Sequence, residues 1–282
     1  MVHSLSFSQE EALGLERIEA AVWGDCFRAA SAEEAAACGT HLDTGPAGTM
    51  MAASGVDVLA FNRLLGFGVE QPATQAMVDA VVASYAAAGV SRFFIQVSPA
   101  ARPPQVYDWL AARGFRHHNN WVKLFRRVED PPQVSTDLHV RPVGPEHAEA
   151  FAGIVALAFE WPDRVMPWLA RLVGRVGWHH YLAFDGDVPV ATGALYVHDG
   201  IGYLGPAATL PACRGRGAQG ALIARRLRDA AALGCSWLVT ETAEDRPGHS
   251  APSMRNMLRY GFEIAYRRPN YLYLLNDPVS SP

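Results

Sequence analysis

The chain has 282 residues, half of them hydrophobic, which suffices for the cores of two domains of ordinary size. A formal net charge of −4 gives it no general attraction for nucleic acid or anionic membrane. We expect no signal peptide and no membrane helix, because no basic N-terminal stretch precedes an apolar one and no apolar run is long enough. The four cysteines show neither disulfide nor metal-ligand spacing, so a reduced cytoplasmic protein without a metal site is expected.

The first half carries one clear succession of elements. The apolar spacing predicts a helix that ends at Gly89, a strand, a second helix that ends at Gly114-Phe115, and a further strand. The expected ranges are 73–88, 91–97, 104–113 and 121–126.

A polar segment with two consecutive prolines, Pro131 and Pro132, follows this half. It has no apolar period, so residues 129–137 are interpreted as an interdomain linker between domains at 1–128 and 138–282.

Downstream of this linker the pattern predicts a strand, two helices and three hairpin-linked strands, then helix, strand, helix and two short strands. Because proline within a strand is confined to edges and bulges, Gly205-Pro206 predicts a bulge in the third hairpin strand. The closing order repeats that of the first half, which indicates two units of one fold. The expected ranges are 138–142, 145–158, 167–176, 180–184, 188–197, 201–210, 217–233, 236–242, 253–260, 262–265 and 270–275.

The turn before the predicted helix at 217–233 is rich in glycine and arginine; residues 213–222 read CRGRGAQGAL. A helix N-terminus exposes unpaired backbone N–H groups, and the helix dipole favours negative charge there. Two arginines add positive charge that pairs well with phosphate oxygens. The turn therefore indicates a phosphate-binding site.

Three interpretations of this turn remain open. Gly215, Gly217 and Gly220 satisfy the dinucleotide pattern G-x-G-x-x-G, and Glu241 lies near the spacing of its acidic residue, which would suit an NAD(P)-dependent oxidoreductase. Against it, Pro211 and a charged residue stand before the first glycine, and the preceding strands are antiparallel. The others are a pyrophosphate loop of another kind and a solvated turn.

Two segments resemble signatures of the GNAT N-acetyltransferase superfamily. Residues 209–218, TLPACRGRGA, look like its acyl-CoA motif, a strand followed by R/Q-x-x-G-x-G/A, although Gln219 stands where a further glycine is frequent. Residues 253–262, SMRNMLRYGF, resemble its second signature, a helix with Asn that ends in Gly-Phe. The resemblance covers residues 138–275. It implies two GNAT-like α/β domains of the α+β type, each a mixed, mostly antiparallel sheet flanked by helices.

The first half resembles the same fold around residues 111–115, but its corresponding loop, GFGVEQPAT at 66–74, has no arginine. Glu70 in that loop would repel a pyrophosphate. The first half is therefore expected to be a degenerate copy without acyl-CoA binding.

The resemblance implies acetyl-CoA as co-substrate. Backbone groups of residues 208–210 would pair with the pantetheine arm, N–H groups of residues 214–220 would hold the pyrophosphate, and two arginine side chains would assist. Asn256 would bind pantetheine or orient its helix, or else bond to local backbone. The implied cofactor-binding residues are Ala208, Thr209, Leu210, Arg214, Gly215, Arg216, Gly217, Ala218, Gln219, Gly220, Ala221 and Asn256.

The implied reaction is direct attack of an amine on the thioester, with a backbone N–H near Thr209 or Leu210 stabilising the oxyanion. A protonated alkyl amine costs roughly 4 kcal/mol to deprotonate at pH 7, so a base is expected. Its candidates are Glu241, Glu160 and Tyr203, each of which also has an ordinary solvated or packing interpretation.

The usual acid of this family is a tyrosine, but this chain has Met257 at that position. Tyr260 is the substitute candidate; alternatively, the CoA thiolate leaves without a dedicated acid.

These patterns together predict an N-acetyltransferase that acts on a primary amine of a small molecule or peptide. A non-catalytic acyl-CoA-binding module and an NAD(P)-dependent oxidoreductase are the alternatives. The sequence leaves the acceptor, and the choice between monomer and homodimer, open.

Overall fold

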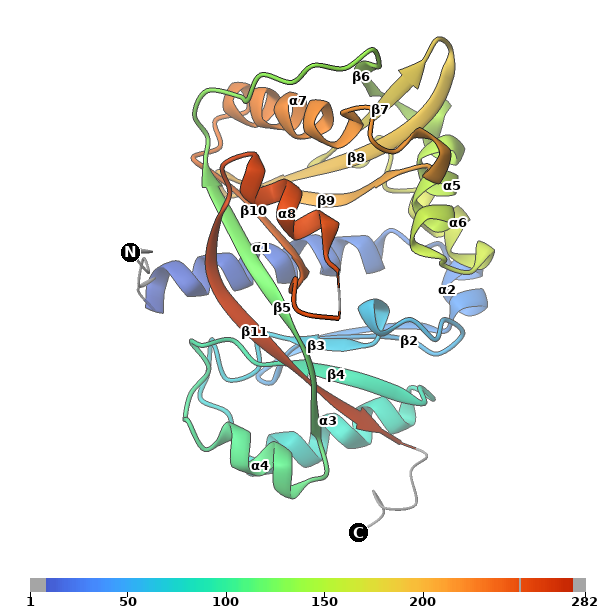
Figure 1. The fold of residues 1–282 in the computed structure, drawn as a ribbon. Coiled ribbons are helices and arrows are strands. Elements are labelled where there is room, and N and C mark those ends of the chain that lie inside the picture. Colours follow the sequence, from blue (N-terminus) through green and yellow to red (C-terminus); the bar gives the residue numbers. More distant parts are fainter. Residues whose placement is uncertain (1–8, 249, 276–282) are drawn as a thin grey trace.

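The computed structural model describes residues 9–248 and 250–275. Its centre is one eleven-stranded mixed sheet in the order β1-β2-β3-β4-β11-β5-β10-β9-β8-β7-β6 (Figure 1). The strands are β1 Thr40–Gly45, β2 Gly48–Ala53, β3 Arg63–Leu65, β4 Arg92–Gln96, β5 Arg116–Arg127, β6 His139–Val143, β7 Trp178–Asp185, β8 Val188–His198, β9 Ile201–Thr209, β10 Trp237–Ala243 and β11 Glu263–Leu274.

Eight α-helices lie within the described residues, none of them long and apolar enough to cross a membrane. They are α1 Gln9–Arg28, α2 Ala32–Cys38, α3 Gln75–Ala87, α4 Val106–Ala112, α5 Ala148–Phe159, α6 Met166–Ala170, α7 Ala218–Ala232 and α8 Pro252–Arg259. Short 3₁₀ turns lie at Leu59–Phe61, Pro145–His147, Asp163–Val165 and Pro211–Cys213.

The strand order is symmetric about the central pair of β5 and β11. On one side β4 pairs with β11 antiparallel and with β3 parallel, and β2 and β1 follow antiparallel. On the other side β10 pairs with β5 antiparallel and with β9 parallel, and β8 and β7 follow antiparallel. The repeated order expected from the sequence is therefore present in the topology.

The expectation of two separate sheets is wrong. Strand β5 belongs to the N-terminal half of the chain but pairs with β10 of the C-terminal half, whereas the last strand, β11, pairs with β4. Each half thus supplies a strand that completes the sheet of the other, and the β5–β11 pair joins both into one sheet.

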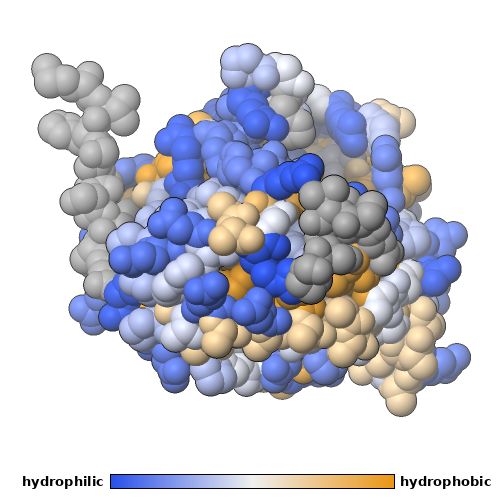
Figure 2. All heavy atoms as spheres, turned by 90° about the horizontal axis from the view of Figure 1, so that it is seen from below, coloured by the Kyte–Doolittle hydropathy of each residue, from blue (hydrophilic) through white to orange (hydrophobic). Residues whose placement is uncertain are grey.

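The two faces of the sheet carry different helices. Val122 and Leu124 of β5 pack in the core beneath α7 and α8, while Lys123 between them faces Glu19 of α1, as the alternation of a strand requires. A second core lies beneath α3 and α4. Helix α1 crosses the opposite face and contacts strands of both halves (Figure 1). Seen from below, hydrophilic and apolar residues are interspersed on the surface (Figure 2).

The elements expected after residue 72 are present with shifted ends. The bulge at Gly205-Pro206 is confirmed by a shift in the β8–β9 register. The second helix of the C-terminal half is shorter than expected, with α6 ending at Ala170, and the two closing strands form one long strand, β11. No helix or strand lies between Arg127 and His139.

Candidate functional site

The turn between β9 and α7 has the backbone of a loop built from glycine. Gly215 and Gly217 have φ of 81° and 83°, a left-handed conformation that costs residues with a side chain free energy. Gly217 is the N-cap residue of α7, so no side chain caps this helix. A Cβ on Gly217 would also lie 2.7 Å from the carbonyl oxygen of Ser135, which is too close.

This turn leaves a run of backbone donors open. The N–H groups of residues 215–220 donate to no residue in the described part of the chain, and the first helical bond runs from the N–H of Ala221 to the carbonyl of Gly217 at 3.1 Å. Six successive free N–H groups at the positive end of a helix favour an anion. Ala221, expected among the cofactor-binding residues, has its N–H engaged within the helix.

The two arginines of the turn differ. Arg216 is held by two carboxylates, Asp137 and Asp185, and its carbonyl accepts a hydrogen bond from Thr136 at 2.7 Å. These partners raise the pKa of Arg216 well above its ordinary value. In this arrangement both negative partners of the Arg216 side chain, which was expected to assist a pyrophosphate, come from the protein. Arg214 is exposed, and its side chain has no hydrogen-bond or ion-pair partner among residues 9–248 and 250–275.

Strands β9 and β10 separate beside this turn. Their parallel pairing runs from Ile201 opposite Trp237 to Tyr203 opposite Val239, and it stops there. The bulge at Gly205-Pro206 bends β9 away at this point. Beyond it, the facing edges of both strands have backbone groups without a strand partner, which is the edge that an extended ligand pairs with.

The β8–β9 register decides which backbone groups of β9 face this gap. Leu210 donates its N–H to Val190 at 2.9 Å, so antiparallel alternation also turns Ala208 toward β8. Thr209, between them, faces the gap. The backbone groups of Ala208 and Leu210, expected to contact the pantetheine arm or the oxyanion, therefore face β8 and not the gap. Gln219 of α7 reaches across and donates to the Thr209 hydroxyl at 3.1 Å.

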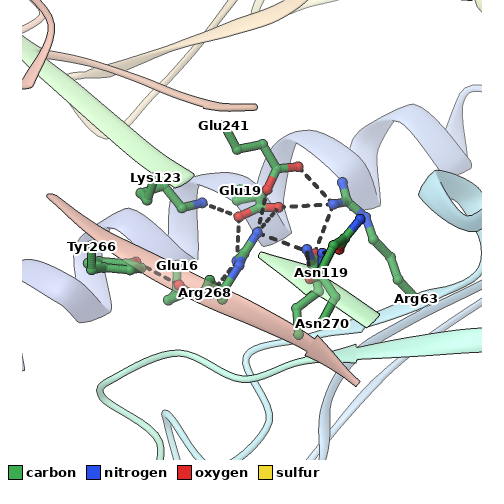
Figure 3. Close-up of polar contacts among 10 residues, drawn as sticks. Glu16, Glu19, Arg63, Asn119, Lys123, Glu241, Tyr266, Arg268 and Asn270 are labelled. Atoms are coloured by element: carbon green, nitrogen blue, oxygen red, sulfur yellow. Dashed lines mark hydrogen bonds and ion pairs between the residues drawn. The ribbon is translucent and has the colours of Figure 1, made fainter. Parts of the chain in front are cut away.

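Glu241 lies on β10, two residues beyond the last pairing with β9, within a buried cluster of charged side chains (Figure 3). Its Oε1 accepts from Arg63 at 2.7 Å, and its Oε2 accepts from Arg268. Arg268 is also bound by Glu16 and Glu19 of α1 at 2.8 Å.

Lys123 pairs with Glu19, so three carboxylates face three cations in this cluster. The guanidinium of Arg63 is fully buried, yet its Nε and Nη2 have no hydrogen-bond partner within the described part of the chain. It lies between the indoles of Trp23 and Trp121, 4.5 and 4.9 Å from their ring centroids, so cation–π attraction offsets part of its desolvation.

Burial raises the pKa of Glu241 to about 7, with the Glu19 carboxylate acting in the same direction and Arg63 and Arg268 against it. Tyr203 lies on the neighbouring strand; its burial and the charges of Glu241 and Glu19 raise its pKa well above its ordinary value. The structure thus brings two of the expected catalytic candidates together, on one face of adjacent strands, with Tyr203 as a neutral phenol at pH 7.

The other two candidates lie elsewhere. Glu160 is exposed at the end of α5, in a left-handed conformation with φ of 55°, and makes no hydrogen bond with the buried cluster. Tyr260 ends α8 and lies directly over Gly220: a Cβ there would meet its hydroxyl at 2.1 Å. Tyr260 therefore packs against the first turn of α7, which explains the need for glycine at 220.

The remaining signature residues lie on α8. Met257 is buried in the core beneath α7 and α8. The Asn256 side chain makes no hydrogen bond with a described residue, so the interpretation in which it satisfies local backbone is not what the structure has.

The corresponding turn of the N-terminal half is closed by the chain itself. Thr74 caps α3, its hydroxyl accepting from the N–H of Met77 at 3.3 Å. The backbone of Arg102 fills the loop, donating to the carbonyl of Gly68 at 2.8 Å and accepting from Ala73 at 2.7 Å. Glu70 is paired with Arg17. A cavity of about 370 Å³ lies nearby, between α1 and the β1–β2 turn, with Glu16 in its wall.

Sequence reasoning missed the partners of Glu241. Glu16, Glu19 and Arg63 lie in the first 65 residues, for which no element was predicted. Lys123 and Arg268 lie on predicted or partly predicted strands, but nothing local marks them as ion-pair partners, because each partner is distant in sequence.

Comparisons with known proteins agree with this geometry. Residues 148–251 match the family model for the acetyltransferase (GNAT) family. The fold is similar to a GCN5-related N-acetyltransferase from Kribbella flavida, with a TM-score of 0.62 at 19% identity over 94% of this chain and 95% of that one. A GCN5-related N-acetyltransferase from Sphaerobacter thermophilus gives a TM-score of 0.57 at 16% identity, over 96% and 95% of the two chains.

A tandem GNAT protein from the clavulanic acid biosynthesis pathway gives a TM-score of 0.54 at 16% identity, over 76% of this chain and 75% of that one. None of the curated proteins compared with the sequence matches it significantly. The family match lies in the C-terminal half, where the open turn is, and the likeness to a tandem protein agrees with a degenerate N-terminal half. The C-terminal half therefore matches the acetyltransferase (GNAT) family, and the chain as a whole has the fold of GNAT proteins.

Proposed function

We propose that the C-terminal half transfers an acetyl group from acetyl-CoA to a primary amine of a small molecule or peptide. The observation that carries this proposal is the run of six free N–H groups at residues 215–220, next to the gap between β9 and β10. A pyrophosphate fits the first feature and an extended pantetheine arm fits the second.

In this proposal the pyrophosphate accepts hydrogen bonds from the backbone of residues 215–220, assisted by Arg214, whose side chain, unlike that of Arg216, is not paired with a described residue. The pantetheine arm pairs with the gap-facing backbone at Thr209, and the Thr209 N–H is the candidate oxyanion donor. Asn256, whose amide has no described partner, is the candidate contact from α8.

Glu241 is the proposed proton acceptor, through a water at the gap. Its side chain is 6% exposed, the largest fraction in the buried cluster, and its pKa of about 7 suits proton transfer at neutral pH. Because the base must be unprotonated, kcat/KM is expected to fall as pH drops below about 7. Protonation of the acceptor amine also lowers kcat/KM as the pH drops, but the pH at which it does so changes with the amine used.

We also propose that residues 1–128 and 138–282 are two GNAT-like units joined by residues 129–137. The repeated strand order and the lack of helix or strand between Arg127 and His139 support this division.

A non-catalytic acyl-CoA-binding module is the second candidate function. Met257 at the usual acid position and the two guanidiniums on Glu241 favour it. Both candidates predict acetyl-CoA binding, measured by calorimetry. Release of free CoA thiol across a panel of amines separates them: amine-dependent release supports the transferase, whereas tight binding without release from any amine supports the module. Binding of NAD(P)H without acetyl-CoA would contradict both.

A further inference from the structure

The carboxylate of Glu241 is held by residues from both halves of the chain. Arg63, on β3 of the N-terminal half, binds one oxygen at 2.7 Å, and Arg268 on β11 binds the other. Arg63 also lies 3.4 Å from Glu19 of α1, which itself binds Arg268 and Lys123. Glu241 therefore has little freedom to turn, and residues far from it in sequence set its orientation (Figure 3).

The charges around Glu241 are balanced. The groups that face it are Glu16 and Glu19 from α1, Arg63 from β3, Lys123 from β5, Arg268 from β11 and the Tyr203 phenol from β9. Removal of one cation leaves an excess of carboxylates, and removal of one carboxylate leaves an excess of cations. In a buried site either change acts directly on the protonation of its neighbours.

The two halves of the sheet differ at this position. Arg63 lies opposite Phe94 in the β3–β4 register as Tyr203 lies opposite Val239 in the β9–β10 register. Two residues further along the parallel partner strand, the N-terminal half has Gln96 and the C-terminal half has Glu241. Gln96 accepts from Arg63 at 2.8 Å. Of these two equivalent positions, the one that carries a carboxylate, Glu241, lies on the side that has the open α7 turn.

We propose that Arg63 and Glu19, both in the N-terminal half, are positioning residues for Glu241. Arg63 orients the carboxylate through its direct contact, and Glu19 holds the cations that balance it. The N-terminal half thereby completes the site of the C-terminal half, although its own loop is closed. This inference rests on the proposed role of Glu241 as proton acceptor.

The test follows the carboxyl group itself, in full-length protein labelled with ¹³C at the glutamate side-chain carboxyl. Glu241→Gln identifies the Glu241 signal by its loss. Arg63→Gln should raise the titration midpoint of that signal by about one pH unit, and Glu19→Gln should lower it by about as much. Arg63→Lys, which keeps the charge, should leave the midpoint in place. Arg92→Gln, which breaks the exposed Arg92–Asp57 pair of the same half, is the matched control and should change nothing.

Folded variants whose Glu241 signal titrates as in the wild type would overturn the inference, because a merely structural role predicts lower melting temperatures without moved midpoints. Where Arg63→Gln does not fold, Glu19→Gln decides by the same signal. Where neither folds, Arg63→Lys decides: reduced kcat with unchanged KM supports positioning, and wild-type kcat contradicts it.

The midpoints need no acceptor amine, so their result is separate from that of the proposed function. Opposite shifts in a protein that releases no thiol would leave the positioning in place and contradict the transferase. Thiol release by variants whose Glu241 titration midpoints have not moved would support the transferase and contradict the positioning.

Discussion

Helices α7 and α3 begin at equivalent places in the two halves of the sheet, and their first turns are opposites. At α3 the Thr74 hydroxyl accepts from the N–H of Met77, and the backbone of Arg102 occupies the loop before the helix. At α7 the cap is Gly217, and residues 215–220 are left with open N–H groups. A capped helix start stabilises the protein, whereas an uncapped one leaves N–H groups that can bind an anion. The comparison shows that the fold alone does not make the site.

The largest expected effect comes from a side chain at Gly217. Gly217→Ala meets both the positive φ and the Ser135 carbonyl, so the turn must move and lose donors. Loss of one or two hydrogen bonds to a charged group costs about 3 kcal/mol, so acetyl-CoA should bind roughly 100-fold more weakly in calorimetry. The control is Gly66→Ala, which has a φ of 76° and open space around the added Cβ. It should cost about 1 kcal/mol of stability and leave the affinity unchanged. Equal losses of affinity would contradict the assignment of the α7 turn.

A negative charge in the first turn of each helix separates binding from stability. Gln219→Glu keeps the side-chain shape and suits the helix dipole, so the melting temperature should not fall. Beside a bound pyrophosphate, however, the added charge should weaken acetyl-CoA binding about tenfold. Gln75→Glu makes the same change in the first turn of α3 and should leave the affinity as it is. If Gln219→Glu binds acetyl-CoA as tightly as the wild type, the pyrophosphate does not lie at α7.

The two arginines of the α7 turn should contribute unequally. Arg214→Gln removes an exposed charge without a protein partner, and we expect about fivefold weaker acetyl-CoA binding at low salt, with a smaller loss at high salt. Arg216→Gln removes a side chain already held by Asp137 and Asp185 and should change the affinity by less than about threefold. Calorimetry at two salt concentrations checks both. A larger loss for Arg216 would show that the two aspartates release it to the ligand.

The smallest effect is expected at the cap of α3. Thr74→Ala removes the hydroxyl that accepts from Met77, which should cost about 1 kcal/mol in denaturant unfolding. Acetyl-CoA affinity should stay unchanged, because the loop before α3 remains filled by Arg102. New anion binding at α3 in this variant would mean that the cap alone closes that turn.

Local signals in the sequence were sufficient for the parts of the fold that follow simple patterns. Helix α7, with glycines before and after it, and the bulge at Gly205-Pro206 could be predicted because each depends on neighbouring residues. Helix α1 could not, since buried Glu16 and Glu19 interrupt the apolar face that marks an amphipathic helix. The exchange of β5 and β11 was also out of reach, because strand pairing across the whole chain leaves no local pattern.

In the candidate site, too, the features that depend on neighbouring residues were predictable and those that depend on distant residues were not. The open turn is a short-range feature, and its glycines predicted it. Which arginine is free was not predictable, since Asp137 and Asp185 approach Arg216 only in the folded chain. Which way the backbone groups of Ala208 and Leu210 face depends on the register between β9 and β8. A sequence pattern shows which side chains share a face of the sheet, but it does not give the register with the neighbouring strand. Glu241 was found, but its partner Arg63 lies 178 residues away.

The exchanged strands also bear on how the protein reaches its native state. Strand β4 finds its neighbour β11 only when residues 263–274 have been synthesised, so the first half leaves the ribosome with an unpaired strand edge. Pairings of such long sequence separation slow folding, because loop closure precedes the contacts that reward it. We therefore expect both halves to fold in one late, shared step rather than in succession, with aggregation as the competing outcome.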